Sequence, residues 1–334
     1  MESVKAAVIG CGESGGGTLQ NLTRAFAGVE VCGVCDAAYA RAEEMAREYG
    51  VPKVYETLED MLEDKAAQII VNLTPSERRS QVTRAALEAG KHVYSESPLA
   101  PSLAEGAELV ELAKQSRLML GCGPDNFLGA GLQTCRKLLD DGYIGSPVGA
   151  AAFIAQYGAA KENDGLYHAG ACCLTALVAL LGPVNRVAGS ARIGETPTHV
   201  TGVIEFEYGS IGTILASSDI WPATMPGFEI YGTEGTISLP APGSFGGPVR
   251  LRRGAGALME IPLTHGYETD SRGIGAADMA RALRSGMSPH RASADLAYHV
   301  LEIMDSLIAS AKTGGHVTLK SSCLRPEPLP TSMP

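Results

Sequence analysis

Along the first 121 residues, apolar and polar positions follow the pattern of repeated strand–helix units. The run 69–73 is apolar on both faces, as a strand inside a parallel sheet requires. After the short apolar run 6–9, Leu19, Leu22 and Phe26 recur at helical spacing. This alternation predicts an α/β fold built on a doubly wound parallel sheet.

From about residue 124 the pattern changes to runs typical of a mostly antiparallel sheet. The long apolar run 166–184 is too short for a membrane span and predicts a buried helix. The predicted strands are 186–193, 198–206, 210–217, 228–231 and 236–239, and helices 275–285 and 294–312 follow them. We therefore predict two domains, 1–123 and 124–334.

Composition and charge narrow the function classes. The chain has 334 residues, 45% of them hydrophobic, with 27 Lys and Arg against 37 Asp and Glu, a net charge of −10. An acidic surface repels phosphate backbones and anionic lipids, so we expect neither a nucleic acid nor a membrane as partner. The amino terminus lacks a secretory signal pattern, and the eight cysteines are scattered. A cytoplasmic protein with reduced thiols is expected.

A glycine-rich turn lies between the first predicted strand and the first predicted helix. Glycines there let the backbone approach a pyrophosphate, which the amino end of the helix attracts. The residues assigned to this contact are Gly10, Gly12, Glu13, Ser14 and Gly15. Asp36 ends the second strand about 20 residues later, where an acid binds the ribose diol of NAD and repels a 2′-phosphate. Arg41 lies close enough to leave NADP open as a cofactor.

Several longer stretches of the sequence are distinctive. They are 72–75, 89–100, 174–184, 229–236 and 290–293. Together they resemble the glucose–fructose oxidoreductase / inositol dehydrogenase / MocA (Gfo/Idh/MocA) family, and the likeness runs from Lys5 to about Leu319. The resemblance implies a Rossmann domain that binds NAD or NADP, with Thr74, Pro75 and Glu96 at the cofactor.

The same resemblance implies a second α/β domain with a large, mostly antiparallel open sheet. Family members usually oxidise or reduce a carbon of a sugar or cyclitol, which binds between the nicotinamide and this second domain. The open sheet often serves for oligomerisation. We therefore expect a sugar-like substrate and a homodimer or homotetramer formed through the sheet.

Three departures from the family pattern concern catalysis. The family motif Glu-Lys-Pro, whose lysine serves as acid or base, is here Glu96-Ser97-Pro98. His168 stands at the position of a family aspartate. Arg79 stands at a position after Thr-Pro where the family frequently has a histidine. The segment 156–165 is also shorter than in relatives.

Removing hydride from a carbinol requires a base for the hydroxyl proton. The Ser97 hydroxyl is too weak a base near neutrality, although it can hold a hydroxyl or a water. Imidazole titrates near a pKa of about 6.5. We predict His168 as the acid–base, with Tyr167 or Tyr157 as a nearby hydrogen-bond donor. The alternative is a histidine that only caps or packs its helix.

Further candidates have ordinary structural alternatives. Asp125 and Asn126 follow the last strand of the first domain and are predicted to bind a polyol, or else are linker residues. Cys172 is placed on the substrate side, against the alternative of core packing. Cys32 and Cys35 have metal-ligand spacing but no second ligand pair, so we predict no metal.

Three functions remain open from the sequence. The first is an NAD-dependent oxidoreductase acting on a carbinol carbon of a sugar or cyclitol. The second is a redox-neutral enzyme with tightly bound NAD that cleaves a glycoside, eliminates or epimerises. The third is a non-catalytic NAD-binding protein.

Overall fold

A computed structural model describes residues 3–155, 165–194, 196–221, 227–239, 243–286 and 289–331. For five residues within α-helices, only the backbone is described: Glu13, Ser14, Gly165, His168 and Ala169. The chain forms two compact units. Among the described residues, the first comprises those within 3–125 and 271–298, and the second those within 126–270 and 299–331. Residues 271–298 thus return to the first unit.

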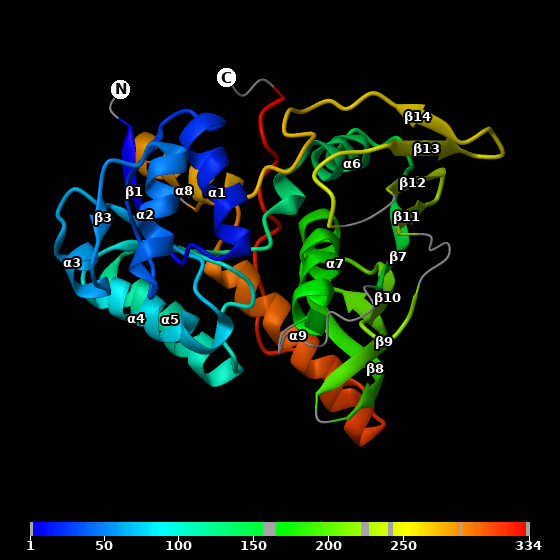
Figure 1. Cartoon of the computed structure of the whole chain (residues 1–334). Helices are drawn as coiled ribbons and strands as arrows, with labels where there is room; N and C mark the ends of the chain where they lie inside the picture. Colours follow the sequence, from blue (N-terminus) through cyan, green and yellow to red (C-terminus); the bar gives the residue numbers. More distant parts are fainter. Residues whose placement is uncertain are drawn as a thin grey trace. The chain divides into compact units, whose positions relative to one another are not determined.

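The described strands of the first unit form a six-stranded parallel sheet in the order β3-β2-β1-β4-β5-β6, of which Figure 1 labels β1 and β3. They are β1 (Val4–Ile9), β2 (Val29–Cys35), β3 (Val54–Tyr55), β4 (Ile69–Asn72), β5 (His92–Ser95) and β6 (Leu120–Cys122). The order reverses between β1 and β4, which defines the doubly wound Rossmann arrangement. The predicted fold class is confirmed.

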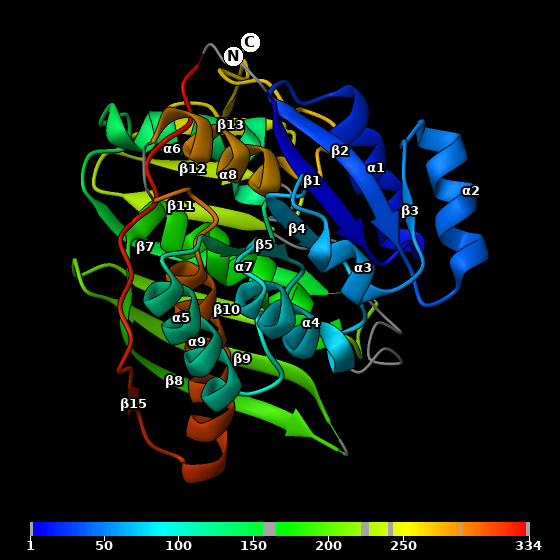
Figure 2. The same ribbon diagram turned by 90° about the vertical axis from the view of Figure 1, so that its left-hand side faces the viewer.

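Helices cover both faces of this sheet. They are α1 (Glu13–Arg24), α2 (Tyr39–Tyr49), α3 (Leu58–Glu63), α4 (Ser76–Glu88), α5 (Leu103–Ser116) and α8 (Ile274–Ser285). Helices α4 and α5 lie side by side (Figure 2), and their apolar faces join Ile70 and Val93 in one buried core. Helix α8 contacts β1, β2, β5 and β6. Each fully buried Leu or Val of this core contributes about 1.5–3 kcal/mol.

The second unit contains a nine-stranded sheet in the order β14-β13-β12-β11-β7-β10-β9-β8-β15 among its described residues. Its strands are β7 (Pro147–Ala155), β8 (Val184–Ile193), β9 (Pro197–Phe206), β10 (Ile211–Ser217), β11 (Phe228–Gly232), β12 (Gly235–Leu239), β13 (Val249–Arg253), β14 (Met259–Ile261) and β15 (Val317–Thr318). Strands β7 and β10 run parallel, and the other described pairs are antiparallel. The predicted mostly antiparallel sheet is confirmed.

The helical elements of the second unit are η1 (Asn126–Leu128), α6 (Ala130–Asp140), α7 (Gly165–Leu181) and most of α9 (Ala294–Thr313). Helix α7 contacts β7, β9 and β10 and is buried all round from Gly170 to Leu181, as its apolar sequence predicts (Figure 1). Within the described part of the chain, every helix is too short or too polar to cross a membrane.

The carboxyl-terminal segment after Leu324 is an extended strap fixed along α6. Arg136 donates a hydrogen bond from Nη1 to the carbonyl of Pro326, at 2.9 Å. The amide of Leu329 donates to Oε1 of Gln133, at 2.8 Å. The prolines of this segment have no amide hydrogen for a sheet, so side chains of α6 provide its partners.

Candidate active site

The loop after β1 contains two glycines whose positions leave no room for a side chain. Gly10 has a φ of +99°, and a Cβ there would lie 2.6 Å from the carbonyl carbon of Leu73. A Cβ at Gly15 would lie 2.8 Å from the carbonyl oxygen of Gly10. At Gly12, by contrast, no described atom lies within 4 Å of the position of a Cβ. The loop therefore leaves open space at the start of α1, which fits the pyrophosphate of a dinucleotide.

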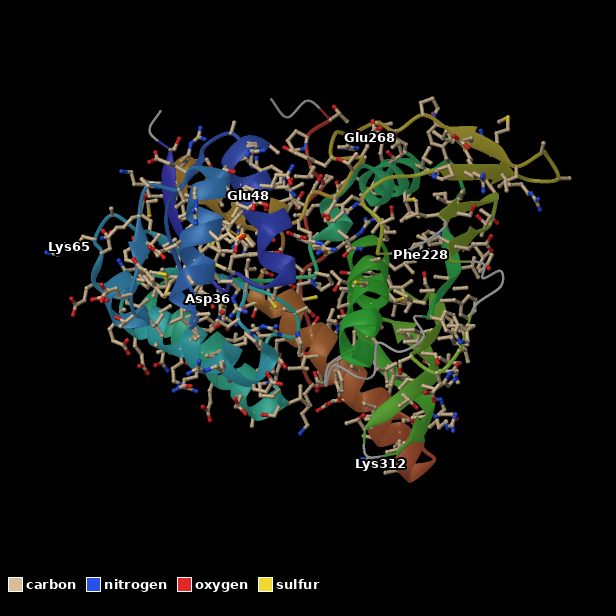
Figure 3. All side chains as sticks on the ribbon, viewed as in Figure 1. Asp36, Glu48, Lys65, Phe228, Glu268 and Lys312 are labelled. Carbon is tan, nitrogen blue, oxygen red and sulfur yellow. The ribbon has the colours of Figure 1, made fainter. Side chains whose placement is uncertain are left out.

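Asp36 lies at the end of β2 and is only 7% exposed (labelled in Figure 3). Its Oδ2 accepts from the amide of Cys11 at 2.7 Å, and its Oδ1 accepts from the amide of Ala38 at 2.7 Å. Oδ1 also pairs with Nη2 of Arg41 at 2.7 Å. Burial alone would raise the pKa of Asp36, but Arg41 and the two amides hold it below its ordinary value. A charged, fixed carboxylate thus stands at the end of β2, where the sequence predicts the binding of a ribose diol.

The loop after β4 is organised by Asn72, which is fully buried. Its Nδ2 donates to the carbonyl of Arg79 and to the hydroxyl of Thr83, both at 3.0 Å. Its Oδ1 accepts from the amide and the hydroxyl of Thr74 at 3.1 and 2.6 Å. Asn72 therefore fixes Thr74, while the exposed Pro75 precedes α4. Sequence reasoning marked the stretch 72–75 as family-like but did not predict this role for Asn72.

The loop after β5 carries the departure from the family motif. Oε2 of the half-buried Glu96 accepts from the amide of Ser97, at 3.2 Å, and Ser97 itself is buried. Arg79, on α4, donates from Nη1 to the carbonyl of Ser97 at 2.8 Å and from Nη2 to that of Thr74 at 3.0 Å. The structure therefore gives Arg79 a defined position between the loops after β4 and β5.

Asp125 follows β6 and is directed at the start of α8. Its Oδ2 accepts from the amides of Gly273 and Gly275, at 3.1 and 3.0 Å. Burial, together with the negative charge of Glu96, raises the pKa of Asp125 to about 6. The hydroxyl of Tyr94 lies against Gly275, where a Cβ would collide with it. Asp125 thus holds a structural place, and its role in polyol binding stays a prediction.

In the second unit, three predicted residues have defined surroundings. The hydroxyl of Tyr167, in the first turn of α7, donates to Oδ1 of Asp305 on α9, at 3.0 Å. Cys172 is buried on α7, and Asn126 is buried in η1. Tyr157 lies outside the described residues, and of His168 only the backbone, in the first turn of α7, is described. Their predicted roles are untested.

The described residues contain no group of three His, Cys, Asp or Glu side chains placed to hold a metal ion. Cys32 and Cys35 are free thiols. Burial, which comes first among the causes in each case, raises the pKa of both, to about 11 for Cys35. Asp36 and the loop after β1 therefore remain the candidate dinucleotide site of the first unit.

Comparison with known proteins places this site in a defined class. Residues 4–123 match the model of an oxidoreductase family with an NAD-binding Rossmann fold, and residues 132–238 match the GFO/IDH/MocA C-terminal domain. The first unit is therefore an NAD-binding Rossmann domain of an oxidoreductase family. The chain belongs to the Gfo/Idh/MocA family, and the two matches cover about two thirds of it. The predicted family and cofactor are confirmed.

Relatives within the family include dehydrogenases of cyclitols. The chain is 28% identical over 250 residues to the scyllo-inositol 2-dehydrogenase (NAD(+)) of Bacillus subtilis, covering 70% of this chain and 73% of the relative. It is 30% identical over 148 residues to the inositol 2-dehydrogenase of Salmonella typhimurium, 44% of each chain. The solved structure of a levoglucosan dehydrogenase with NADH and levoglucosan has a TM-score of 0.84 at 19% identity, covering 96% of this chain and 100% of that one. This last likeness shows the shared fold.

Proposed function

We propose that the protein is a dehydrogenase that transfers hydride between NAD and a carbinol carbon of a sugar or cyclitol. The observation that carries the proposal is the fixed Asp36 carboxylate beside the open glycine loop at residues 10–15. The cyclitol dehydrogenases among the relatives support the class of substrate. In this proposal the first unit binds the cofactor and the second supplies the substrate side.

Each candidate residue then has one task. Bound NAD supplies the hydride acceptor or donor. The amides of residues 10–15 bind the pyrophosphate, Asp36 accepts from the ribose diol, and Arg41 neutralises Asp36 when no ribose is bound. Thr74, Pro75 and Glu96 line the cofactor site on the side of β4 and β5.

The acid–base step is assigned to His168. Oxidation of a carbinol releases a hydroxyl proton, and a neutral imidazole near pH 7 accepts it, then returns it in the reverse direction. Ser97 orients the hydroxyl by a hydrogen bond, and Tyr167, held by Asp305, supports the first turn of α7. Asp125, Asn126, Tyr157 and Cys172 are assigned to the substrate side.

A homodimer or homotetramer formed through the open sheet is part of the proposal. Val203 on β9, Ile211 on β10 and Tyr231 on β11 are 41%, 54% and 39% exposed. The strand registers place the three on one face of the sheet. These apolar side chains on β9, β10 and β11, with Gly149 of β7 between Ile211 and Tyr231, suit burial against a second copy. Analytical sedimentation of the purified chain tests the proposed oligomer. A monomer at micromolar concentration would contradict it.

The test of function is turnover of a panel of cyclitols and aldoses with added NAD. The proposal expects NADH to accumulate with at least one polyol. Turnover of a glycoside by protein that retains NAD, without net NADH, would favour the redox-neutral alternative. Binding of NAD with no turnover of any substrate in the panel would favour the non-catalytic alternative.

A further inference from the structure

Arg79 lies on α4 and is buried, with 8% of its surface exposed. Its Nε and Nη2 both donate to the carbonyl of Thr74, at 3.2 and 3.0 Å. Its Nη1 donates to the carbonyl of Ser97 at 2.8 Å and reaches that of Pro98 at 3.4 Å. One guanidinium therefore joins the loop after β4 to the loop after β5.

No carboxylate among the described residues forms an ion pair with Arg79. Glu96, which precedes Ser97, accepts from the amide of Ser97 instead. Carbonyl dipoles solvate the guanidinium, but they leave its net charge in place. Burying a charge without a counterion is costly, so the fold keeps a permanent positive charge in this position at a cost in stability.

The position of this charge along the sheet is informative. A dinucleotide lies across the carboxyl ends of a Rossmann sheet and crosses at the point where the strand order reverses, here between β1 and β4. Asp36 marks the adenosine side, at the end of β2. The loops that Arg79 joins follow β4 and β5, on the opposite side of the crossing, where a bound nicotinamide would lie.

We propose that Arg79 biases the bound cofactor toward its reduced form. The oxidised nicotinamide ring carries one positive charge, and accepting a hydride from a carbinol removes it. A fixed guanidinium nearby therefore disfavours NAD+ relative to NADH. Arg79 is a positioning residue, acting through the loops and through its field. The inference rests on the NAD site and not on His168 or the substrate.

The experiment compares the dissociation constants of NAD+ and NADH for the full chain, by calorimetry. At an effective dielectric constant of about 20, a unit charge placed roughly 8–10 Å from the ring would change the ratio of the two constants by about fifteen- to thirtyfold. In Arg79→Gln, the ratio Kd(NAD+)/Kd(NADH) should fall by that factor. Arg79→Lys keeps the charge but loses the fork of hydrogen bonds, so the ratio should stay within about twofold.

Arg78 offers a matched control, because it neighbours Arg79 on α4 and is exposed. Arg78→Gln should leave the ratio unchanged. If Arg79→Gln weakens both cofactor forms equally, Arg79 only clamps the loops and the proposal is overturned.

Circular dichroism checks that each variant is folded. If Arg79→Gln does not fold, Arg79→His at pH 8, where imidazole is neutral, replaces it with the same expected fall in the ratio. A ratio that changes in Arg79→Lys also overturns the proposal. No arm of the experiment uses a substrate, so a failure of the proposed dehydrogenase activity leaves its result intact.

Discussion

The carboxyl edge of the six-stranded sheet and the first turn of α7 hold their polar residues in different ways. At the edge, Asp36, Asn72 and Arg79 are buried, and each is fixed by at least three hydrogen bonds to the backbone or to neighbouring side chains. In the first turn of α7, Tyr167 is half-buried and bonded to Asp305 on another helix. The candidate cofactor residues are thus part of the fold, whereas the proposed acid–base residue belongs to a helix end whose side chains can change without changing the sheet.

The largest expected effect is on turnover, in the first turn of α7. His168→Ala should lower kcat by about 10²–10⁴-fold, because the hydroxyl proton loses its acceptor. The melting temperature and the Kd of NAD should stay at their wild-type values. The pH–rate profile of the wild type should inflect near pH 6.5, as expected for an imidazole. His168→Gln is the matched control for side-chain volume, and an unchanged profile in either variant removes His168 from the mechanism.

At the carboxyl edge, we expect a glycine substitution to lower stability only where the added Cβ meets the backbone. Gly10→Ala puts a Cβ against the Leu73 backbone at a positive φ and should cost roughly 2–4 kcal/mol of unfolding free energy. Gly12→Ala has free space for its Cβ, so it should keep the melting temperature while weakening NAD binding. Thermal melts and NAD titrations of both variants measure this. Equal melting temperatures for the two variants would contradict the packing argument.

Asp125 should make stability depend on pH. Its folded pKa, about 6, lies above the ordinary value of 3.8, so the folded state binds the proton more tightly. Above pH 6 the buried Asp125 carboxylate is charged and lowers the free energy of unfolding. This loss disappears as the pH falls toward 4 and the carboxylate is protonated. The unfolding free energy of the wild type, relative to Asp125→Asn, should therefore rise by about 2–3 kcal/mol between pH 7 and pH 4. Denaturant titrations at several pH values measure it, and a difference that stays constant would show that Asp125 is charged throughout.

The smallest expected effect concerns the choice of cofactor. Asp36→Asn removes the charge that the ribose diol prefers and that a 2′-phosphate avoids. NAD should bind roughly tenfold more weakly or worse, and NADP should gain relative to NAD. Arg41→Gln, which keeps the carboxylate, is the control and should leave the preference for NAD in place. If Asp36→Asn weakens the binding of NAD and of NADP by the same factor, Asp36 acts only by holding the loop after β1 in place.

The sequence predicted the elements with strong periodicity and local signals. Residues 10–15 and Asp36 lie where the glycine spacing and strand ends placed them. Strands β13 and β14 were missed: Val249 and Leu251 alternate with arginines, but the runs are only five and three residues long, and the pairing with β12 supplies the missing context. The predicted boundary at residue 123 did not anticipate that residues 271–298 pack with the first unit, since long-range packing leaves no local signature.

By itself, the sequence determined that the chain folds around a dinucleotide, because glycine spacing and hydrophobic periodicity are local properties of the chain. Only the tertiary structure decided what Asn72, Arg79 and Asp125 do, since their partners come from other loops and helices. Residue type alone identified Arg79 as a departure from a motif. The structure shows that Arg79 is buried and that three backbone carbonyls hold its charged group in place at the edge of the sheet.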